Sequence, residues 1–211
     1  MSKSLRRNSL QVTQHTTPYT DVPALSGQLV RLSKSVYKRG FYNNEMVAGY
    51  ELSYVKKPIT VTSLDVKCRD GVWRTLMVDD PMHWLGMGEL AKLALPGTVL
   101  VAGLGMGLLL HHLVKRDDIT KILVVEIDPE IIEFVSPYLP KDDRIVFRVG
   151  NFYHFCTEHY KHFETAIIDL WVLNDSSTRQ ERQRVSASMS VARALSNEFC
   201  KKVLIWGVRG Y

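Results

Sequence analysis

The sequence has few cysteines and no long apolar run, and each absence excludes a class of protein. Its three cysteines, Cys68, Cys156 and Cys200, lie far apart without CxxC spacing, which argues against a disulfide framework and against a zinc site. Free thiols are typical of a reducing compartment, so we expect a cytoplasmic protein. No apolar run approaches the roughly 18 residues that cross a bilayer, so we expect no membrane partner.

Acidic residues are absent from the first 20 positions, where Ser, Thr and Gln accompany Lys3, Arg6 and Arg7. The stretch lacks the apolar segment of a secretory signal, and its Arg-rich, acid-poor composition is compatible with a mitochondrial transit peptide. Because it has little amphipathic periodicity, we favour a disordered basic arm over residues 1–20. The whole chain carries a net charge of +5. That charge is spread out and forms no run of basic residues, so nucleic acid is the less favoured partner.

A change of pattern at Pro96-Gly97 divides the rest of the chain. After it, short apolar runs alternate with helical patterns, which predicts a Rossmann-like, mostly parallel α/β sheet with helices on both faces. The predicted strands are Thr98–Ala102, Lys121–Val125, Arg144–Val149, Thr165–Ile168 and Lys202–Trp206. The predicted helices are Leu108–Lys115, Pro129–Leu139, Phe152–Tyr160 and Ser177–Phe199.

Residues 21–95 have a different character, because alternating patterns dominate there. We expect strands at Glu51–Tyr54, Ile59–Ser63, Leu64–Cys68 and Val72–Val78, with a hairpin at Asp70-Gly71 and a helix at Trp84–Leu95. The sequence therefore predicts a small antiparallel β region with one helix over 21–95 and a cofactor-binding domain over 96–211.

The strongest local motif is Gly103-x-Gly105-x-Gly107, directly after a predicted strand and before a predicted helix. Glycines allow a sharp turn and a close approach of a ligand to the backbone, and the helix offers free N–H groups. A tight turn that only packs strand on helix is the alternative. Glu126, 19 residues after Gly107 at the end of the next strand, favours a ligand, because a carboxylate can accept both hydroxyls of a ribose.

The spacing of the loop distinguishes between nucleoside cofactors. A dinucleotide fingerprint needs a third glycine at position 108, which is Leu108. The loop is apolar, with Leu104 and Met106, and no cationic or hydroxyl side chain lies nearby to hold a pyrophosphate. A ligand without phosphate therefore fits better than a dinucleotide.

The runs VLVAGLGMG, KILVVEIDPEIIEFV, RIVFRVGN and AIIDLW together resemble the class I S-adenosylmethionine-dependent methyltransferase fold, and within it the spermidine-synthase-like branch. The resemblance implies S-adenosylmethionine or its decarboxylated form as cofactor. It implies that the three loop glycines pass beneath the methionine and ribose, that Glu126 holds the ribose hydroxyls and that Ile127 packs on the adenine. Asn151 occupies the position of an adenine-binding Asp, and Asp169 lies at the substrate rim as the candidate catalytic residue.

The chain departs from that branch at several points. The Tyr-His-Glu element expected before the glycine loop is reduced to Glu89, and Leu170-Trp171 follows Asp169 where a Ser-Ser-Asp-like loop is expected. A full methyltransferase sheet continues to a sixth and a seventh strand, whereas the C-terminal strands after the fifth are missing here. Either the sheet is trimmed, or its edge is protected by N-terminal strands or by a partner chain. The sequence leaves open whether the chain forms a homodimer.

Other candidate residues have two interpretations each. Asp79 and Asp80 either cap the following helix or add negative charge to a substrate pocket, together with Glu89. Trp171 is either a core aromatic or a lid on that pocket. We expect no metal site, because His111 and His112 point to different helix faces. The arginines of 179–193 are expected on a solvated helix face.

These observations predict a transferase. The first hypothesis is a methyltransferase that acts on a small-molecule acceptor, with Asp169 orienting or deprotonating the nucleophile. The first alternative is an aminopropyltransferase that uses decarboxylated S-adenosylmethionine. The second alternative is a non-catalytic or nucleic-acid-associated module that retains the fold.

Overall fold

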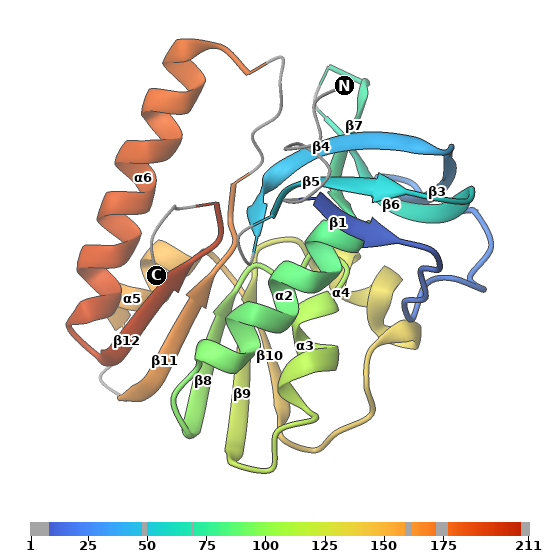
Figure 1. Ribbon diagram of the computed structural model, residues 1–211. Helices are drawn as coiled ribbons and strands as arrows, with labels where there is room; N and C mark the ends of the chain where they lie inside the picture. The colour runs from blue at the N-terminus through green and yellow to red at the C-terminus, as the bar shows by residue number, and fades with distance from the viewer. Residues whose placement is uncertain (1–8, 48–49, 69, 159–161, 172–176, 208–211) are drawn as a thin grey trace. The chain divides into compact units, whose positions relative to one another are not determined.

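The computed structural model describes residues 9–47, 50–68, 70–158, 162–171 and 177–207 (Figure 1). The chain divides into two compact units. The first comprises Met1–Ala91, Gly105–His112 and Phe134–Leu139, and the second comprises Lys92–Leu104, Leu113–Glu133 and Pro140–Tyr211. The domain boundary predicted between residues 95 and 96 stays a prediction.

A five-stranded parallel sheet forms the centre of the second unit. Its strands are β8 (Gly97–Ala102), β9 (Ile119–Glu126), β10 (Ile145–Val149), β11 (Phe163–Ile168) and β12 (Cys200–Ile205). They lie in the order β10-β9-β8-β11-β12, and every neighbouring pair is parallel. This is the strand order of a Rossmann-like fold, so the predicted α/β class is confirmed.

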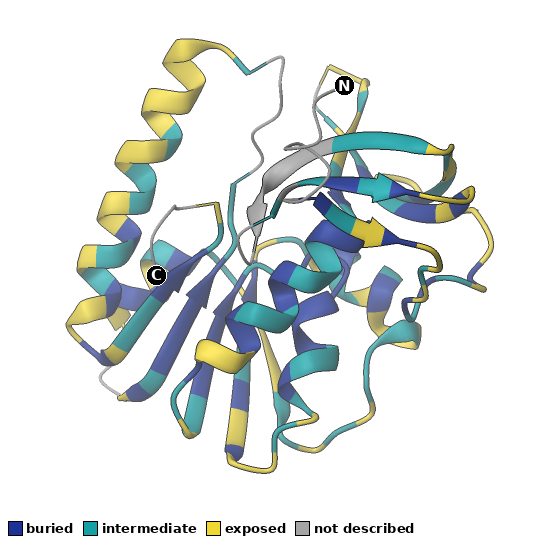
Figure 2. Ribbon diagram, in the orientation of Figure 1, coloured by how far each residue is buried: buried dark blue, intermediate teal, exposed yellow. Residues whose placement is uncertain are grey.

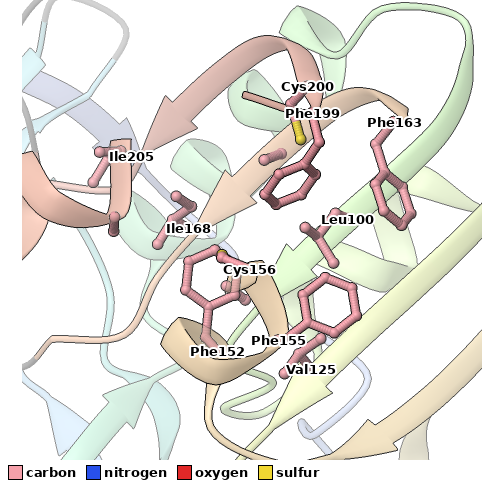
Figure 3. Packing of buried hydrophobic residues seen from close by; sticks show 13 residues of the cluster. Leu100, Val125, Phe152, Phe155, Cys156, Phe163, Ile168, Phe199, Cys200 and Ile205 are labelled. Carbon is pink, nitrogen blue, oxygen red and sulfur yellow. The ribbon is translucent and has the colours of Figure 1, made fainter. Parts of the chain in front are cut away.

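Helices α5 (Phe152–Glu158) and α6 (Arg179–Asn197) pack against this sheet. Beneath them lies an apolar core in which Phe155, Phe163 and Phe199 contact one another in tilted and edge-on geometries (Figure 3). Leu100 and Ile168 supply the sheet side of the same core. The continuous apolar runs that predicted these strands therefore reflect burial in the interior.

Helix α6 is buried only towards its C-terminal end, where Ala192 and Ser196 face the core. Figure 2 shows its N-terminal turns exposed around the helix, and residues 179–184 are all exposed. The prediction of a solvated arginine-bearing face is confirmed for Arg179, Arg182 and Arg184.

Three shorter elements follow the glycine loop and the second strand of the sheet. Helix α3 spans Leu108–Leu113, and α4 spans Pro129–Val135 and continues as the 3-10 turn η1 (Ser136–Tyr138). Pro129 stands first in α4, as predicted, because its fixed φ suits the first helical position.

Two small sheets and helix α2 (Pro81–Leu93) belong to the first unit, which takes in α2 as far as Ala91. One sheet has the order β1-β5-β4, and the other has the antiparallel order β2-β3-β6-β7. Their bounds are β1 (Ser9–Val12), β2 (Leu25–Ser26), β3 (Val30–Tyr37), β4 (Gly40–Val47), β5 (Tyr50–Val55), β6 (Ile59–Lys67) and β7 (Trp73–Val78). Buried residues of β1, β5 and β6 form one apolar cluster, made of Val12, Val55, Ile59 and Val61.

Strand β6 replaces the two strands predicted over 59–68. It pairs with β3 without interruption, and a register irregularity at Leu64 and Asp65 in its pairing with β7 puts both side chains in the interior. Two successive buried residues interrupt the alternation of inward and outward side chains close to the boundary that the sequence predicted between Ser63 and Leu64. The hairpin at Asp70-Gly71 is confirmed, since Gly71 has φ +77 and Asp70 Oδ1 accepts the Val72 N–H.

Residues 9–20 differ from the disordered arm predicted over 1–20, whose first eight residues lie outside the described range. Ser9–Val12 form β1 in parallel pairing with β5, and Tyr19 has no exposed surface. Polar residues of this segment are held by hydrogen bonds to residues distant in the chain, and amino-acid composition does not reveal such contacts.

Candidate functional site

The strand order of the second unit reverses between β8 and β11, and ligands of such sheets bind beyond the carboxyl ends of the strands at this point. Gly103 follows β8, and Asp169 follows β11 and donates its N–H to Ala102 O at 2.9 Å. A Cβ on Gly103 would lie 2.1 Å from the Asp169 carbonyl oxygen, and Gly103 has φ +86. Glycine is therefore required where the two connections pass each other.

Glu126 ends β9 at the same edge and is 6% exposed. Its Oε2 accepts the Leu104 N–H at 2.8 Å and its Oε1 accepts the Asp128 N–H at 3.0 Å. These bonds fix the carboxylate between the start of the glycine loop and the turn after β9. Each carboxylate oxygen has a second lone pair, so the group can also accept two adjacent hydroxyls.

The end of β10 lies beside Glu126, because the Gly150 N–H donates to Glu126 O at 2.8 Å. The next residue, Asn151, begins α5 with its Oδ1, which accepts the Tyr153 N–H at 2.8 Å. One lone pair of that oxygen is thus used, and the other is available. Ile127 is 64% exposed, which is unusual for a large apolar side chain beside a buried carboxylate.

Asp169 is half-buried, and the two residues after it turn towards the interior. Leu170 and Trp171 are partly buried and pack against the apolar core of the second unit. Of the two interpretations of Trp171, this contact supports the core aromatic. The next carboxylate after Asp169 in the sequence, Asp175, lies outside the described residues.

The second half of the glycine loop belongs to the first unit. Gly105 has φ +51, and a Cβ on it would lie 2.6 Å from Met77 Cε. The Met106 N–H donates to Met77 Sδ at 3.3 Å, and the Tyr19 hydroxyl donates to Met106 O at 2.6 Å. Gly107 precedes α3 and its carbonyl accepts the Leu110 N–H. Tyr19 and Met77 were missed by sequence reasoning, since neither belongs to a recognisable motif.

The acidic residues before α2 have internal partners in the same unit. Asp80 Oδ1 accepts the N–H groups of Met82 and His83 at 2.9 Å, so the predicted helix cap is confirmed for Asp80. Asp79 is 2% exposed, and its oxygens accept the Thr62 N–H and the Thr17 hydroxyl.

Asp79 and Asp80 also shift the pKa values of nearby titratable side chains. Burial lowers the pKa of His83, although Asp80 and Asp79 act in the opposite direction. Burial raises the pKa of Tyr37, and Asp80 raises it further. Glu89 lies half-buried on α2.

Among the described residues, no group of three or more His, Cys, Asp or Glu side chains is arranged to hold a metal ion. His111 contacts the Tyr138 carbonyl oxygen at 3.0 Å, and the ring of His112 lies 4.1 Å from that of Trp84. Within the same described ranges, no helix combines the length and apolarity that crossing a bilayer requires.

The second unit thus has the strand order, the glycine turn and the strand-end carboxylate of a nucleoside-binding α/β fold. A model of the spermine/spermidine synthase domain family matches residues 86–197, which is 112 of the 211 residues. The chain therefore belongs to the spermine/spermidine synthase domain family.

The chain is also similar to individual known proteins. The chain is 30% identical over 80 residues to a polyamine aminopropyltransferase of Bacillus mycoides (strain KBAB4), a match that covers 35% of this chain and 29% of that protein. A spermidine synthase solved in complex with the transition-state analogue AdoDATO matches with a TM-score of 0.51 and 19% identity, over 85% of this chain and 54% of that one. Spermidine synthase from Thermotoga maritima has a TM-score of 0.45 and 17% identity, over 84% and 63%. The chain thus spans about half the length, or less, of the first two relatives.

Proposed function

We propose that this chain is an aminopropyltransferase that takes the aminopropyl group from decarboxylated S-adenosylmethionine and passes it to a small polyamine. The family membership and the name of the Bacillus relative support this reaction over the methyl transfer that the sequence alone favoured. Three free cysteines agree with the expected reducing, cytoplasmic setting.

The residues of the second unit fit a sulfonium nucleoside. Glu126 would hold the ribose hydroxyls with the lone pairs that its two backbone donors leave available. Ile127, exposed and apolar, would pack on the adenine, and Asn151 would accept from the adenine amino group. Gly103 leaves its backbone without a side chain beside Glu126, and Gly105 and Gly107 would continue that path.

The bound nucleoside supplies a carbon that its sulfonium sulfur makes electrophilic. The chain must then orient an amine of the acceptor towards that carbon. We assign this to Asp169, at the switch point, whose carboxylate would orient the amine and accept its proton as the C–N bond forms and the C–S bond breaks. Trp171 would support this position from the core rather than cover it.

The buried carboxylate of Glu126 is the observation that carries the proposal. Its removal by Glu126→Ala should weaken binding of decarboxylated S-adenosylmethionine about 10- to 100-fold, because two charge-assisted hydrogen bonds to the ribose are lost. Calorimetry with that nucleoside, with S-adenosylmethionine and with S-adenosylhomocysteine checks this. Glu158→Gln, an exposed change on α5 that breaks only the pair with Arg148, is the matched control. If wild type binds none of the three nucleosides, the proposal is wrong.

Methyl transfer is the second candidate, and Asp79 and Asp80 are the observation in its favour. An aminopropyl acceptor is a polycation that needs several carboxylates, yet both of these are used by hydrogen bonds within the first unit. Formation of methylthioadenosine that depends on added putrescine would support aminopropyl transfer. Conversion of S-adenosylmethionine to S-adenosylhomocysteine with a non-polyamine acceptor would support methyl transfer instead.

A further inference from the structure

The peptide group of Met106, in the middle of the glycine motif, is held from both sides by side chains of the first unit. Its N–H donates to Met77 Sδ at 3.3 Å, and its carbonyl accepts the Tyr19 hydroxyl at 2.6 Å. Met106 and Tyr19 have no exposed surface, and Met77 is 8% exposed. We call this pair of contacts the Met106 clamp.

The Tyr19 side of the clamp is anchored by residues 15–20, a segment that sequence analysis assigns to a disordered arm. The Thr17 hydroxyl donates to Asp79, and Thr17 Oγ1 accepts the Tyr19 N–H. The Lys34 ammonium donates to the carbonyls of Tyr19 and Thr20 at 2.6 and 3.2 Å. Two anchors, the buried Asp79 and the half-buried Lys34, therefore fix the position of the phenol.

The protonation of the phenol suits its role as a donor. Burial raises the pKa of Tyr19, and Asp79 and Tyr138 raise it further. Tyr19 therefore keeps its proton through neutral pH and donates it to Met106 O. Its ring also lies 5.5 Å from that of Tyr138, so the aromatic contact does not depend on the hydroxyl.

The Met77 side of the clamp explains the second glycine of the motif. Met77 Cε lies 2.6 Å from the position that a Cβ of residue 105 would take, too close for any side chain there unless Met77 moved. The sulfur also takes up the Met106 N–H, which is then not offered to a ligand. In a site that works by positioning, a displacement of about 1 Å caused by a distant change can cost about 100-fold in rate.

We infer that Tyr19 and Met77 are positioning residues that fix the path of Gly105–Gly107, the part of the glycine loop in the first unit, and that nucleoside binding depends on this path. The expected effect on nucleoside affinity rests on the proposed function. The expected effect on the conformation of the loop rests only on the fold without ligand.

The experiment compares Tyr19→Phe with Tyr42→Phe in the full chain. Both changes delete a phenol hydroxyl that donates to a backbone carbonyl, but the Tyr42 hydroxyl bonds to Lys38 O in a different part of the first unit. Tyr19→Phe should weaken S-adenosylhomocysteine binding about 5- to 50-fold at a temperature well below the unfolding midpoint, because a buried carbonyl loses its donor. Tyr42→Phe should leave that affinity within about twofold.

Amide hydrogen exchange without ligand gives a second readout. Tyr19→Phe should accelerate exchange across residues 105–110 relative to wild type, and Tyr42→Phe should not. Met77→Leu, which keeps the apolar volume and removes the sulfur acceptor, should change affinity and exchange in the same direction. The double variant should be non-additive, because both residues hold one peptide group.

The outcomes separate this inference from the proposed function. If wild type binds none of the nucleosides, the proposed function fails, and the exchange rates alone decide whether the clamp positions the loop. If Tyr19→Phe and Met77→Leu lower only the unfolding midpoint and leave both affinity and loop exchange as in wild type, the clamp is merely structural and the inference is overturned.

Discussion

At the scale of single residues, two glycines of similar backbone conformation have very different surroundings. Gly103 has φ +86 and its missing Cβ would meet the Asp169 carbonyl at 2.1 Å. Gly71 has φ +77 and nothing within 4 Å of that position. The comparison separates the cost of the backbone conformation from the cost of the close approach.

Gly103→Ala should lower the free energy of unfolding by about 4 kcal/mol or more, because the main chain just after β11 must move to admit the methyl group. Gly71→Ala should cost only about 1–2 kcal/mol, the ordinary penalty of a left-handed alanine. Urea denaturation of both variants measures the difference. Equal losses of unfolding free energy would show that the Asp169 carbonyl moves aside at little cost. Its close approach to Gly103 would then not require glycine.

Two buried thiols of the second unit make stability depend on alkaline pH. Burial raises the pKa of Cys156 from 9.0 to about 11. Burial, with a smaller contribution from Cys156, raises the pKa of Cys200 from 9.0 to about 12. A group that binds its proton more tightly in the folded state stabilises the fold below its unfolded pKa, and this contribution is lost as pH rises towards the folded pKa.

The free energy of unfolding should therefore fall above about pH 9, with a slope of up to about 1.4 kcal/mol per pH unit for each thiol. Urea titrations at pH 8, 9, 10 and 11 measure this slope. Cys156→Ala/Cys200→Ala should flatten it between pH 9 and 10, below the range in which the buried tyrosines contribute. An unchanged slope in the double variant would mean that the thiols are not its source.

At the scale of elements, α6 is a helix whose first turns have no packed face. Its N-terminus is held by a capping box, in which Thr178 Oγ1 accepts the Glu181 N–H and Glu181 Oε2 accepts the Thr178 N–H. Because residues 179–184 are exposed, this cap is their main local restraint.

Thr178→Ala should destabilise the start of α6 by about 1 kcal/mol, which corresponds to about a fivefold faster amide exchange over 181–184. Exchange near Ala192 and Ser196, which pack on the core, should stay as in wild type. Ser190→Ala, an exposed change in the same helix, is the control and should not accelerate exchange at the N-terminus. Faster exchange along the entire helix would indicate that α6 opens as one unit.

The same scale explains which elements a sequence can predict. The five strands of the parallel sheet were located to within a few residues, since strands buried on both faces are continuous apolar runs. Strands β1, β2, β3 and β4 were missed. In β3, polar residues such as Arg31, Ser33 and Lys34 interrupt the apolar pattern. Arg31 and Ser33 are explained by Asp65 on the neighbouring strand β6, which accepts hydrogen bonds from both.

Those bonds also shift the pKa of Asp65. Burial alone would raise the pKa of this carboxyl, but the donors Ser33, Thr75 and Arg31 outweigh it and lower the pKa. Strand β3 therefore owes its polar face to a partner 32 residues or more away, which no local pattern contains.

At the scale of the whole molecule, the sequence located the carboxyl edge of the sheet but not the first unit's share in the glycine loop. Gly103, Glu126 and Asp169 were expected there because the carboxyl ends of parallel strands share one edge. The roles of Tyr19 and Met77 were not accessible, since they arise from contacts 87 and 29 residues apart in the chain.

One side chain links segments that are distant along the second unit. The Arg144 guanidinium donates to the carbonyls of Val114, Arg116 and Ile119 at 2.6–2.8 Å and pairs with Asp142. It thus joins the start of β10, an edge strand, to the segment that leads into β9. Its hydrogen bond to the carboxylate, with a smaller contribution from its backbone N–H, also lowers the pKa of Asp142 to about 2.

Arg144→Lys should lower the free energy of unfolding by about 2–3 kcal/mol, because one ammonium cannot reach three carbonyls and a carboxylate in the geometry that the planar guanidinium provides. Arg148→Lys is the matched control in β10. Arg148 bonds to Glu158 at an exposed position and stacks on Phe155, so its loss should stay below about 1 kcal/mol. Urea denaturation compares the two, and a proton titration of Asp142 should show its pKa rising in Arg144→Lys only. Equal losses in both variants would mean that β10 is held by its backbone pairing with β9 and that Arg144 adds no more than a surface ion pair.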